Sequence, residues 1–474
     1  MIKFMLNGEW VTESDIDPTL SVLRYLRTKK GLTGTKEGCA SGDCGACTLL
    51  IGEVNADRAT YKAVNSCITL LGDLHGKHIV SVEGVNASAE VHPVQACMVE
   101  HHGSQCGFCT PGIVMSLVGL REKQQSCSRA DALEALSGNL CRCTGYRPIV
   151  DAALASFQQS DVNNVINATT AWQIPELESC ASLQSEKGSY FAPQHEAELK
   201  TVLAENPQAR FVAGATDLAL DITQQYKTFD CLVSLSNVAE LSELSEAGDV
   251  LNIGGAATYS AVMPWLKTWY PQVVELFDRI GSLQIRNRGT IGGNVANASP
   301  IGDTPPILLA LGASLELATV NSRRLVAIDD FFKGYKQTVL KAGEYIRTIS
   351  IPKPKADTQL KLYKVSKRYD DDISAVMAAF FFKIEQGIIS EARLAFGGMA
   401  AIPKYAESAQ ASLIGKAMSA DTLSIAMAAL NNDFAPMTDV RATDKYRLKV
   451  AQNLLQKAFA EINESMEIGV FHYA

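Results

Sequence analysis

The most informative stretch of this sequence is GCASGDCGAC, which spans residues Gly38–Cys47. Its cysteines follow the order Cys39-x4-Cys44-x2-Cys47, and Cys67 comes after a further nineteen residues. Glycines between the cysteines allow positive φ angles and a close approach of the backbone, so the loop can wrap a compact inorganic core. The stretch therefore predicts a metal site at which four thiolates converge.

The order of these cysteines is that of the plant-type [2Fe–2S] ferredoxins. Zinc is the alternative, but structural zinc sites favour two matched Cys-x2–4-Cys pairs or added histidines. A disulfide framework suits small secreted chains, whereas this chain has 474 residues and twelve cysteines, ten of them before residue 145. We therefore expect an iron–sulfur cluster on Cys39, Cys44, Cys47 and Cys67.

A second group of cysteines follows, in the order Cys106-x2-Cys109 and, after thirty-one residues, Cys141-x-Cys143. By itself this group could bind zinc, bind an iron–sulfur cluster or form a redox dithiol. Pro111 favours a helix start, Ile113–Leu120 has the composition of a buried helix, and Ser128 begins a capping-box pattern for a helix that runs through Leu136. Each cysteine pair would then lie in a loop at a helix end.

The remaining cysteines and the histidine pair are not expected to bind a metal. We interpret the four scattered cysteines as small buried hydrophobic residues, namely Cys97, Cys127, Cys180 and Cys231. The pair His101-His102 is assigned to a loop or an interface, because the eight clustered cysteines already supply two complete sets of cluster ligands.

Composition and charge exclude several classes of protein. The length allows roughly three domains, and 47% hydrophobic residues provide for packed cores. The net charge of −8 without a basic tract argues against binding nucleic acid. The longest apolar run, Ala375–Phe382, is too short to cross a bilayer, and the N-terminus lacks the apolar core of a signal peptide, so we expect a cytoplasmic protein with no membrane partner.

Two glycine-rich loops follow in the remaining sequence. The first lies within Phe211–Leu218, and the second runs from Gly289 to Asn294 and continues to Asp303. Small side chains let backbone N–H groups converge on an anion such as a pyrophosphate. No two glycines are separated by a single residue, so the GxGxxG fingerprint is absent and a bound flavin or nucleotide would need another fold.

Several segments of this region have a recognisable periodicity. Glu196–Glu205 is expected to be a helix, and Asp421–Leu430 and Asp444–Phe459 are expected to be amphipathic helices. Strands are expected at Ala209–Ala213, Leu232–Leu235 and Val250–Gly254.

The two cysteine motifs in tandem, over about Lys3–Asp151, resemble the iron–sulfur portion of the xanthine oxidase/molybdenum hydroxylase family, and the two glycine loops resemble its flavoprotein domain. The resemblance implies a multidomain α+β chain. The implied parts are a β-grasp ferredoxin-like domain at 1–80, a four-helix [2Fe–2S] domain at 81–155, a linker at 156–189, a vanillyl-alcohol-oxidase-type FAD-binding domain at 190–355 and a small α+β domain at 356–474.

The resemblance also assigns site residues. It implies that both cysteine groups bind [2Fe–2S] clusters, so that Cys106, Cys109, Cys141 and Cys143 join the first four as ligands. The implied FAD contacts are Phe211, Val212, Ala213, Gly214, Ala215, Thr216, Asp217, Leu218, Thr290, Ile291, Gly292, Gly293, Asn294, Asp303, Ile346 and Lys364. Gln105 would touch a molybdopterin, and Tyr335 would lie on the approach of NAD, where a packed surface tyrosine is nearly as good an interpretation.

The resemblance also relates three further parts of this sequence to positions near the flavin in the family's flavoprotein domain. Gly254–Thr258 matches a family segment on the flavin side, and this match is weaker than those of the two glycine-rich loops. Ile280 stands where vertebrate members have an aromatic residue beside the flavin ring, which leaves the stacking partner open. The acidic loop of the family corresponds to Arg368–Asp372 in altered form.

The implied function is electron transfer. The chain would receive electrons from a separate large subunit, on which a molybdopterin oxidises xanthine or hypoxanthine, and pass them through two clusters to FAD and then NAD. A dimer of such heterodimers is expected. The alternatives are an equivalent subunit for an aldehyde or another N-heterocycle and, in a different class, a non-catalytic iron–sulfur redox sensor or scaffold.

Overall fold

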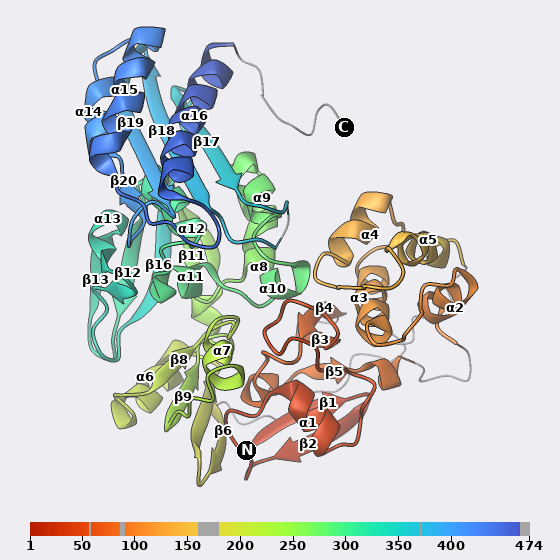
Figure 1. The fold of residues 1–474 in the computed structure, drawn as a ribbon. Coiled ribbons are helices and arrows are strands. Elements are labelled where there is room, and N and C mark those ends of the chain that lie inside the picture. The colour runs from red at the N-terminus through yellow and green to blue at the C-terminus, as the bar shows by residue number, and fades with distance from the viewer. Residues whose placement is uncertain (56–57, 86–90, 160–179, 370, 465–474) are drawn as a thin grey trace. The chain divides into compact units, whose positions relative to one another are not determined.

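The structure, a computed structural model, describes residues 1–55, 58–85, 91–159, 180–369 and 371–464 (Figure 1). One compact unit comprises Met1–Leu241 with the short segments Thr258–Ser260 and Gly281–Thr290. A second unit comprises Ser242–Ala257, Ala261–Ile280 and Ile291–Ala474. Residues 190–241 of the predicted FAD-binding domain therefore belong to the same unit as both cysteine groups.

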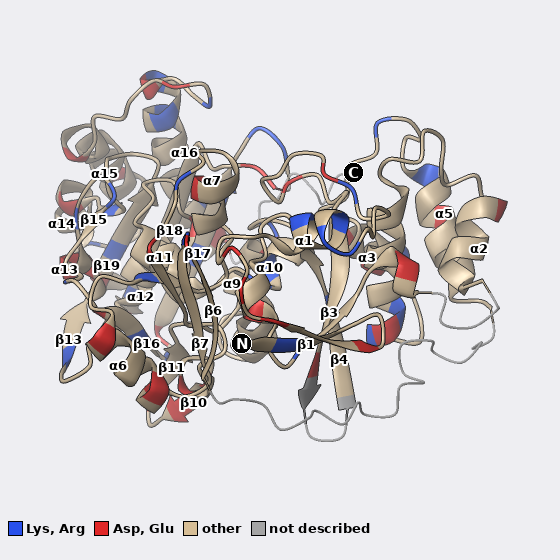
Figure 2. Ribbon diagram, turned by 90° about the horizontal axis from the view of Figure 1, so that it is seen from below, with Lys and Arg blue, Asp and Glu red and all other residues tan. Residues whose placement is uncertain are grey.

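The first unit begins with a five-stranded sheet ordered β2-β1-β5-β3-β4. Its strands are β1 (Ile2–Leu6), β2 (Glu9–Glu13), β3 (Thr48–Asn55), β4 (Arg58–Asn65) and β5 (His78–Val80). Strand β1 pairs with β5 in parallel, and the other pairs are antiparallel. Helix α1 (Val22–Thr28) buries Tyr25 and Leu26 against Phe4 in one core and leaves its arginines, blue in Figure 2, away from it. A mixed sheet around one helix is the β-grasp arrangement that the resemblance implied.

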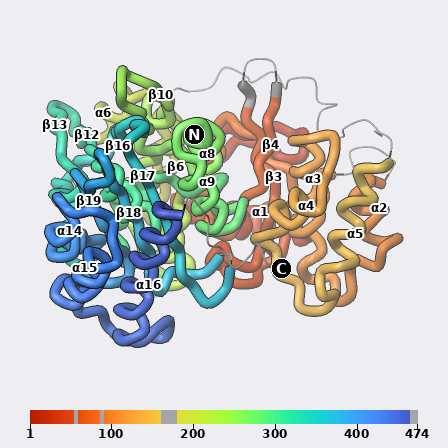
Figure 3. The backbone as a smooth tube through the Cα atoms, turned by 90° about the horizontal axis from the view of Figure 1, so that it is seen from above, coloured from red at the N-terminus to blue at the C-terminus, as the bar shows by residue number. Residues whose placement is uncertain are grey.

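Short 3-10 turns and four helices follow this sheet. The turns are η1 (Leu71–Leu74) and η2 (Val82–Gly84), and the helices are α2 (Pro93–Glu100), α3 (Thr110–Lys123), α4 (Arg129–Ala135) and α5 (Arg147–Ser156). Helix α3 contains the predicted segment Ile113–Leu120, and Figures 1 and 3 both show it beside β3 and β4. The predicted capping box at Ser128 is present, with Asp131 as its second member.

A four-stranded sheet ordered β6-β7-β9-β8 completes the first unit. Its strands are β6 (Cys180–Ser185), β7 (Gly188–Pro193), β8 (Arg210–Val212) and β9 (Cys231–Ser234), with α6 (Glu196–Glu205), α7 (Leu218–Thr223), η3 (Ala239–Leu241) and α10 (Leu283–Arg286). The predicted helix Glu196–Glu205 is confirmed. The predicted linker 156–189 is too long, because β6 and β7 form a hairpin across a two-residue turn; residues 160–179 of that linker lie outside the described residues.

The second unit contains an antiparallel sheet ordered β10-β11-β16-β12-β13. Its strands are β10 (Leu244–Ala247), β11 (Val250–Gly254), β12 (Ser314–Ala318), β13 (Arg323–Ala327) and β16 (Tyr345–Pro352), and β14 (Phe332–Gly334) and β15 (Gln337–Thr338) form a separate hairpin. The associated helices are α8 (Tyr259–Leu266), α9 (Pro271–Phe277), α11 (Ile291–Asn297), α12 (Thr304–Leu311) and α13 (Ile328–Phe331). The predicted strand Val250–Gly254 is confirmed as β11.

The last sheet is ordered β17-β18-β19-β20. Its strands are β17 (Thr358–Val365), β18 (Val376–Glu385), β19 (Ile388–Gly397) and β20 (Lys404–Tyr405), and its helices are α14 (Glu407–Leu413), α15 (Ala420–Asp433) and α16 (Asp444–Asn463). Phe380, Phe396 and Phe459 join the sheet and the helices in one core. Helices α15 and α16 confirm both predicted amphipathic segments. Within the described ranges, no helix is long and apolar enough to cross a membrane.

Two buried histidines stabilise backbone turns in the first unit. His78 pairs with the Tyr61 hydroxyl through Nδ1 at 2.9 Å and accepts the Gly8 N–H through Nε2 at 3.3 Å. His92 accepts the Val94 N–H through Nδ1 at 3.2 Å and so caps α2. Burial lowers the pKa of both imidazoles to about 4, so both are neutral at pH 7.

We expect acidification to destabilise the protein through these histidines. Between their ordinary pKa of 6.5 and about 4, the unfolded chain binds more protons than the folded one, so stability falls as the pH falls through this window. The loss is at most roughly 1.4 kcal/mol per pH unit for each histidine. Denaturant unfolding at pH 7 and pH 5 measures this, and a His78→Gln/His92→Asn variant should lose less stability between the two. An equal loss in both proteins would contradict the assignment.

Candidate cofactor sites

The first group of cysteines lies between α1 and β3 and just after β4. Cys39 and Cys44 are half-buried, and Cys47 and Cys67 are buried. Their thiols lie within hydrogen-bonding reach of one another, Cys39 with Cys44 and Cys67, and Cys47 with Cys67. The structure therefore brings together all four side chains that the spacing predicts.

The backbone of this loop turns its N–H groups toward the sulfurs. Ala40, Gly42 and Gly45 have positive φ angles of 54°, 86° and 68°. The N–H groups of Ser41 and Cys44 donate to Cys39 Sγ at 3.4 and 3.3 Å, and the Cys39 N–H donates to Cys44 Sγ at 3.4 Å. Hydrogen bonds to sulfur are one of the ways in which a protein sets the reduction potential of an iron–sulfur cluster.

The second group of cysteines lies in two loops that precede helices. Cys106 and Cys109 come just before α3, and Cys141 and Cys143 come just before α5. The thiols are paired across these loops, Cys109 with Cys141 and Cys106 with Cys143. Cys106 and Cys143 are exposed, so this group lies at the surface of the first unit.

The first group forms one connected set of four thiols, in which Cys39 reaches Cys44 and Cys67, and Cys67 also reaches Cys47, whereas the second group forms two pairs. Among the residues that the structure describes, no three Cys, His, Asp or Glu side chains gather as they would around a single metal ion. A [2Fe–2S] cluster shares four cysteines between two irons, so it needs two pairs rather than one tetrahedron. Each group supplies four thiols, which is the number of ligands that a [2Fe–2S] cluster takes.

A buried polar network joins the two cysteine loops. The Leu140 N–H donates to the Cys44 carbonyl at 3.0 Å, and Asn139 Nδ2 donates to the Gly45 carbonyl at 3.1 Å. Asn139 Oδ1 accepts from Ser116 Oγ at 2.6 Å and from Gln284 Nε2 at 2.9 Å. Sequence reasoning missed Asn139 and Gln284, because nothing in their local sequence distinguishes them from loop residues.

The first glycine-rich loop joins β8 to α7. A Cβ on Gly214 would overlap the carbonyl oxygen of Arg288, so two backbone segments pack directly on each other here. Asp217 is exposed, and Ala215 is buried with a positive φ of 62°. The loop therefore has little side-chain bulk where it packs on the segment that contains Arg288.

Arg288, beneath this loop, is fixed by a buried carboxylate. Its guanidinium forms an ion pair with Asp73, which is fully buried and also accepts from Tyr190 Oη at 2.5 Å and Ser234 Oγ at 2.8 Å. Burial alone would raise the pKa of Asp73, but Arg288 and Lys77 hold this pKa below its ordinary value. Because Asp73 lies in η1, this ion pair ties the first glycine loop to the ferredoxin-like sheet.

The second glycine-rich loop starts at Thr290 and runs into α11. A Cβ on Gly292 would overlap the Gly255 carbonyl, and a Cβ on Gly255 would overlap the carbonyl of Ile346, another predicted FAD contact. Asn294 Oδ1 is buried and has no hydrogen-bond partner within the described structure. An orphaned acceptor in this loop fits a ligand that donates a hydrogen bond.

Asp303 and Lys364 form a buried ion pair in the second unit. Lys364 Nζ lies 2.6 Å from Asp303 Oδ2, and Ser374 Oγ is 2.9 Å from Lys364 Nζ and 2.5 Å from Asp303 Oδ1. Two of the three Lys364 donors are therefore used by the protein. Ser374 is a further member of this cluster that sequence reasoning missed.

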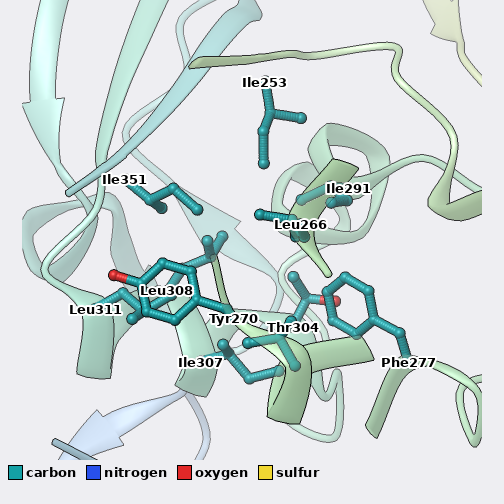
Figure 4. A pocket seen from close by; sticks show the side chains of 11 residues that line it. Ile253, Leu266, Tyr270, Phe277, Ile291, Thr304, Ile307, Leu308, Leu311 and Ile351 are labelled. Atoms are coloured by element: carbon teal, nitrogen blue, oxygen red, sulfur yellow. The ribbon is translucent and has the colours of Figure 1, made fainter. Parts of the chain in front are cut away.

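A small cavity lies under the second glycine loop (Figure 4). Its lining is almost entirely apolar, with Ile291, Phe277 and Ile307 pointing inward and Thr304 at one side. It has space for about one water molecule. We interpret it as a packing gap, because it is far too small for a flavin ring.

The remaining predicted residues lie at or near the surface. Gln105 is exposed directly before Cys106, and Tyr335 is 62% exposed in the turn between β14 and β15. Ile280 is half-buried; its neighbour Arg279 donates to the Tyr369 carbonyl at 3.2 Å and stacks on its ring. Asp370, in the predicted acidic loop, lies outside the described residues.

Within the part of the chain that the structure describes, the scattered cysteines and the histidine pair belong to no group of three or more potential metal ligands. Cys97 is buried, as predicted, whereas Cys127, Cys180 and Cys231 are half-buried, so the prediction of buried residues is wrong for these three. His101 and His102 are exposed after α2.

Four family models match consecutive parts of the chain. A 2Fe-2S iron-sulfur cluster binding domain matches residues 4–72, and a [2Fe-2S] binding domain matches residues 81–154. The FAD binding domain in molybdopterin dehydrogenase matches residues 183–354, and the CO dehydrogenase flavoprotein C-terminal domain matches residues 361–462. Both predicted cluster domains and the predicted flavoprotein module are therefore present.

A structure of CO dehydrogenase from Oligotropha carboxidovorans matches 57% of this chain and 97% of its own, with a TM-score of 0.54 and 30% identity. The chain belongs to the xanthine oxidase/molybdenum hydroxylase family. Quinoline 2-oxidoreductase from Pseudomonas putida 86, a similar structure, is covered over 96% of its chain and covers 58% of this one, with a TM-score of 0.53 and 29% identity. The xanthine dehydrogenase of Drosophila subobscura is 32% identical over 84% of this chain. This molybdenum hydroxylase chain spans about a third (34%) of that relative's length.

We expect Gly45→Ala to remove the first cluster. Gly45 has a positive φ, and a Cβ there would overlap Gly138 and Asn139, so the loop that carries Cys44 and Cys47 has to move. The iron content should fall from about four to about two per chain. Gly31→Ala is the matched control, because Gly31 also has a positive φ (70°) but has open space around a Cβ. Equal iron contents in the two variants would contradict this account.

Proposed function

We propose that this chain is the electron-transfer part of a xanthine dehydrogenase, and that a molybdopterin-containing partner subunit oxidises xanthine or hypoxanthine. The observation that carries the proposal is the presence of two four-thiol groups and a flavoprotein module in one chain. When bound, the clusters would carry single electrons, and FAD would collect two of them and release a hydride to NAD.

The residues of the chain have distinct parts in this proposal. The two thiol groups hold the clusters, and each glycine-rich loop, taken by itself, offers backbone N–H groups to FAD. Asn294 Oδ1 accepts a hydrogen bond from the cofactor, and Lys364 offers its remaining N–H to it, while Asp303 balances the lysine charge. Gly214 and Gly292 let the backbone of each loop pack directly on a neighbouring backbone segment, because a side chain there would overlap that segment.

The surface around the second thiol group supports a partner subunit. Cys106 and Cys143 are exposed, and the apolar side chains of Phe108 and Leu140 beside them are 47% and 57% exposed. Apolar surface beside an exposed cluster suits burial against another protein. In this proposal, Gln105 faces the molybdopterin of the partner, and two such heterodimers associate.

The proposed acceptor is NAD, and exposed Tyr335 would lie on its approach to the flavin. All twelve cysteines are free thiols, which suits the reducing cytoplasm proposed for this protein.

An equivalent subunit for another substrate is the second candidate. The similarity to a quinoline 2-oxidoreductase favours an N-heterocycle other than a purine, and an aldehyde is a further option. Only the partner subunit would hold the substrate pocket in either case, so the assembled complex has to be assayed.

We expect the isolated chain to oxidise NADH with an artificial acceptor but to produce no urate from xanthine. A complex with its molybdopterin subunit, purified from the native cell, should reduce NAD in the presence of xanthine. Urate formation by the isolated chain would contradict the split-subunit proposal. Turnover of quinoline or an aldehyde, but not of purines, by the complex would establish the second candidate, and a chain without flavin absorbance would favour a redox sensor.

We expect Asp303→Ala to lower FAD occupancy severalfold, because it leaves the buried Lys364 ammonium without its carboxylate partner. Asp303→Asn should lower it less, since its amide oxygen can still accept from Lys364. Asp330→Ala, at an exposed position of α13, is the control. Flavin absorbance and iron content are measured together, and unchanged flavin in Asp303→Ala would remove Asp303 from the site.

A further inference from the structure

Helix α7 connects the first glycine loop to the loop of the first cysteine group. The glycine loop ends at Leu218, where α7 begins, and the helix is about 9 Å long. At its far end, Thr223 Oγ1 lies 2.8 Å from the Ala40 carbonyl. Gln224 Nε2 lies 3.1 Å from both the Cys39 and the Ala40 carbonyls. All of these residues belong to the first unit.

The Ala40 carbonyl belongs to a strained part of the loop. Ala40 has a positive φ of 54°, a conformation that an L-residue other than glycine rarely adopts. Such strain persists only where the surroundings stabilise it. The Thr223 hydroxyl, whose one hydrogen is shared with the Ala219 carbonyl at 3.0 Å, and the amide of Gln224, the C-cap of α7, converge on this one carbonyl and provide that stabilisation.

The same peptide unit carries a hydrogen bond to a cluster ligand. In a trans peptide the C=O and the N–H point in opposite directions. The Ala40 carbonyl points to α7, so the Ser41 N–H of that peptide points the other way, and it donates to Cys39 Sγ at 3.4 Å. Holding the carbonyl therefore also holds the N–H against the sulfur.

We propose that Thr223 and Gln224 are positioning residues for the first [2Fe–2S] cluster, and that α7 links its reduction potential to the loop proposed to bind FAD. This inference rests on the proposed function. Donation of an N–H to a ligand sulfur stabilises the more negative, reduced cluster, so the contact raises the potential. The reduction potential of the first cluster would thus depend partly on α7, the helix that follows the loop proposed to bind FAD.

The test is a redox titration of the full chain followed by EPR. Gln224→Ala changes an exposed side chain and should fold normally, and Thr223→Val/Gln224→Ala removes all three hydrogen bonds. The first cluster, identified by the signal lost in Cys39→Ala, should titrate at a lower potential, with the larger shift in the double variant. The potential of the second cluster should not change.

A rescue variant and a control variant distinguish this role from a non-specific loss of local structure around the mutated residues. Adding Ala40→Gly to the double variant should recover at least half of the shift, because glycine adopts positive φ without strain. Thr201→Val is the control: Thr201 donates only to a carbonyl of its own helix, a bond that Thr223 also makes. It should leave both potentials at their wild-type values.

Each outcome bears on one proposal. A wild-type potential in the double variant, an equal shift of both clusters, or a shift that Ala40→Gly leaves unchanged would each overturn the role of Thr223 and Gln224 while leaving the electron-transfer function intact. A wild-type chain with no EPR-active centres after anaerobic iron reconstitution would instead overturn the proposed function.

Discussion

The convergence of the four thiols of the first cysteine group is the constraint on which the surrounding part of the first unit depends. It draws together residues 39–47 and the turn after β4, and it requires the backbone between them to fold inward. That fold places positive φ angles at Ala40, Gly42 and Gly45 and leaves no room for a side chain at Gly45. The neighbouring elements, Asn139 with Leu140 on one side and α7 on the other, provide the hydrogen bonds that hold such a loop.

The division of the chain into units follows this constraint rather than the boundaries of the family domains. Sheet β6–β9 and the segment Gly281–Thr290 pack with the cysteine loops. The Asp73–Arg288 ion pair and the Gln284–Asn139 hydrogen bond join these parts from within the core. The first glycine-rich loop is therefore packed within the same unit as both cysteine groups.

The residues that could be predicted from the sequence are those whose function requires a particular spacing along the chain. Cluster ligands must follow one another in a short loop, so both cysteine groups were recognisable locally, as were helices with strong periodicity or a capping box. Asp73, Asn139 and Ser374 were missed because their importance comes from partners more than twenty residues away or in another element. Strand β6 was assigned to the linker because its alternation is short, with only Ala181 and Leu183 as buried apolar residues.

Anomalous X-ray diffraction at the iron K edge measures most directly whether the two groups of thiols hold binuclear clusters. Crystals grown from protein purified without oxygen should show two pairs of iron atoms. One pair should lie among Cys39, Cys44, Cys47 and Cys67, and the other among Cys106, Cys109, Cys141 and Cys143. A single isolated metal peak within either group, or a peak at the zinc edge in place of iron, would contradict this account.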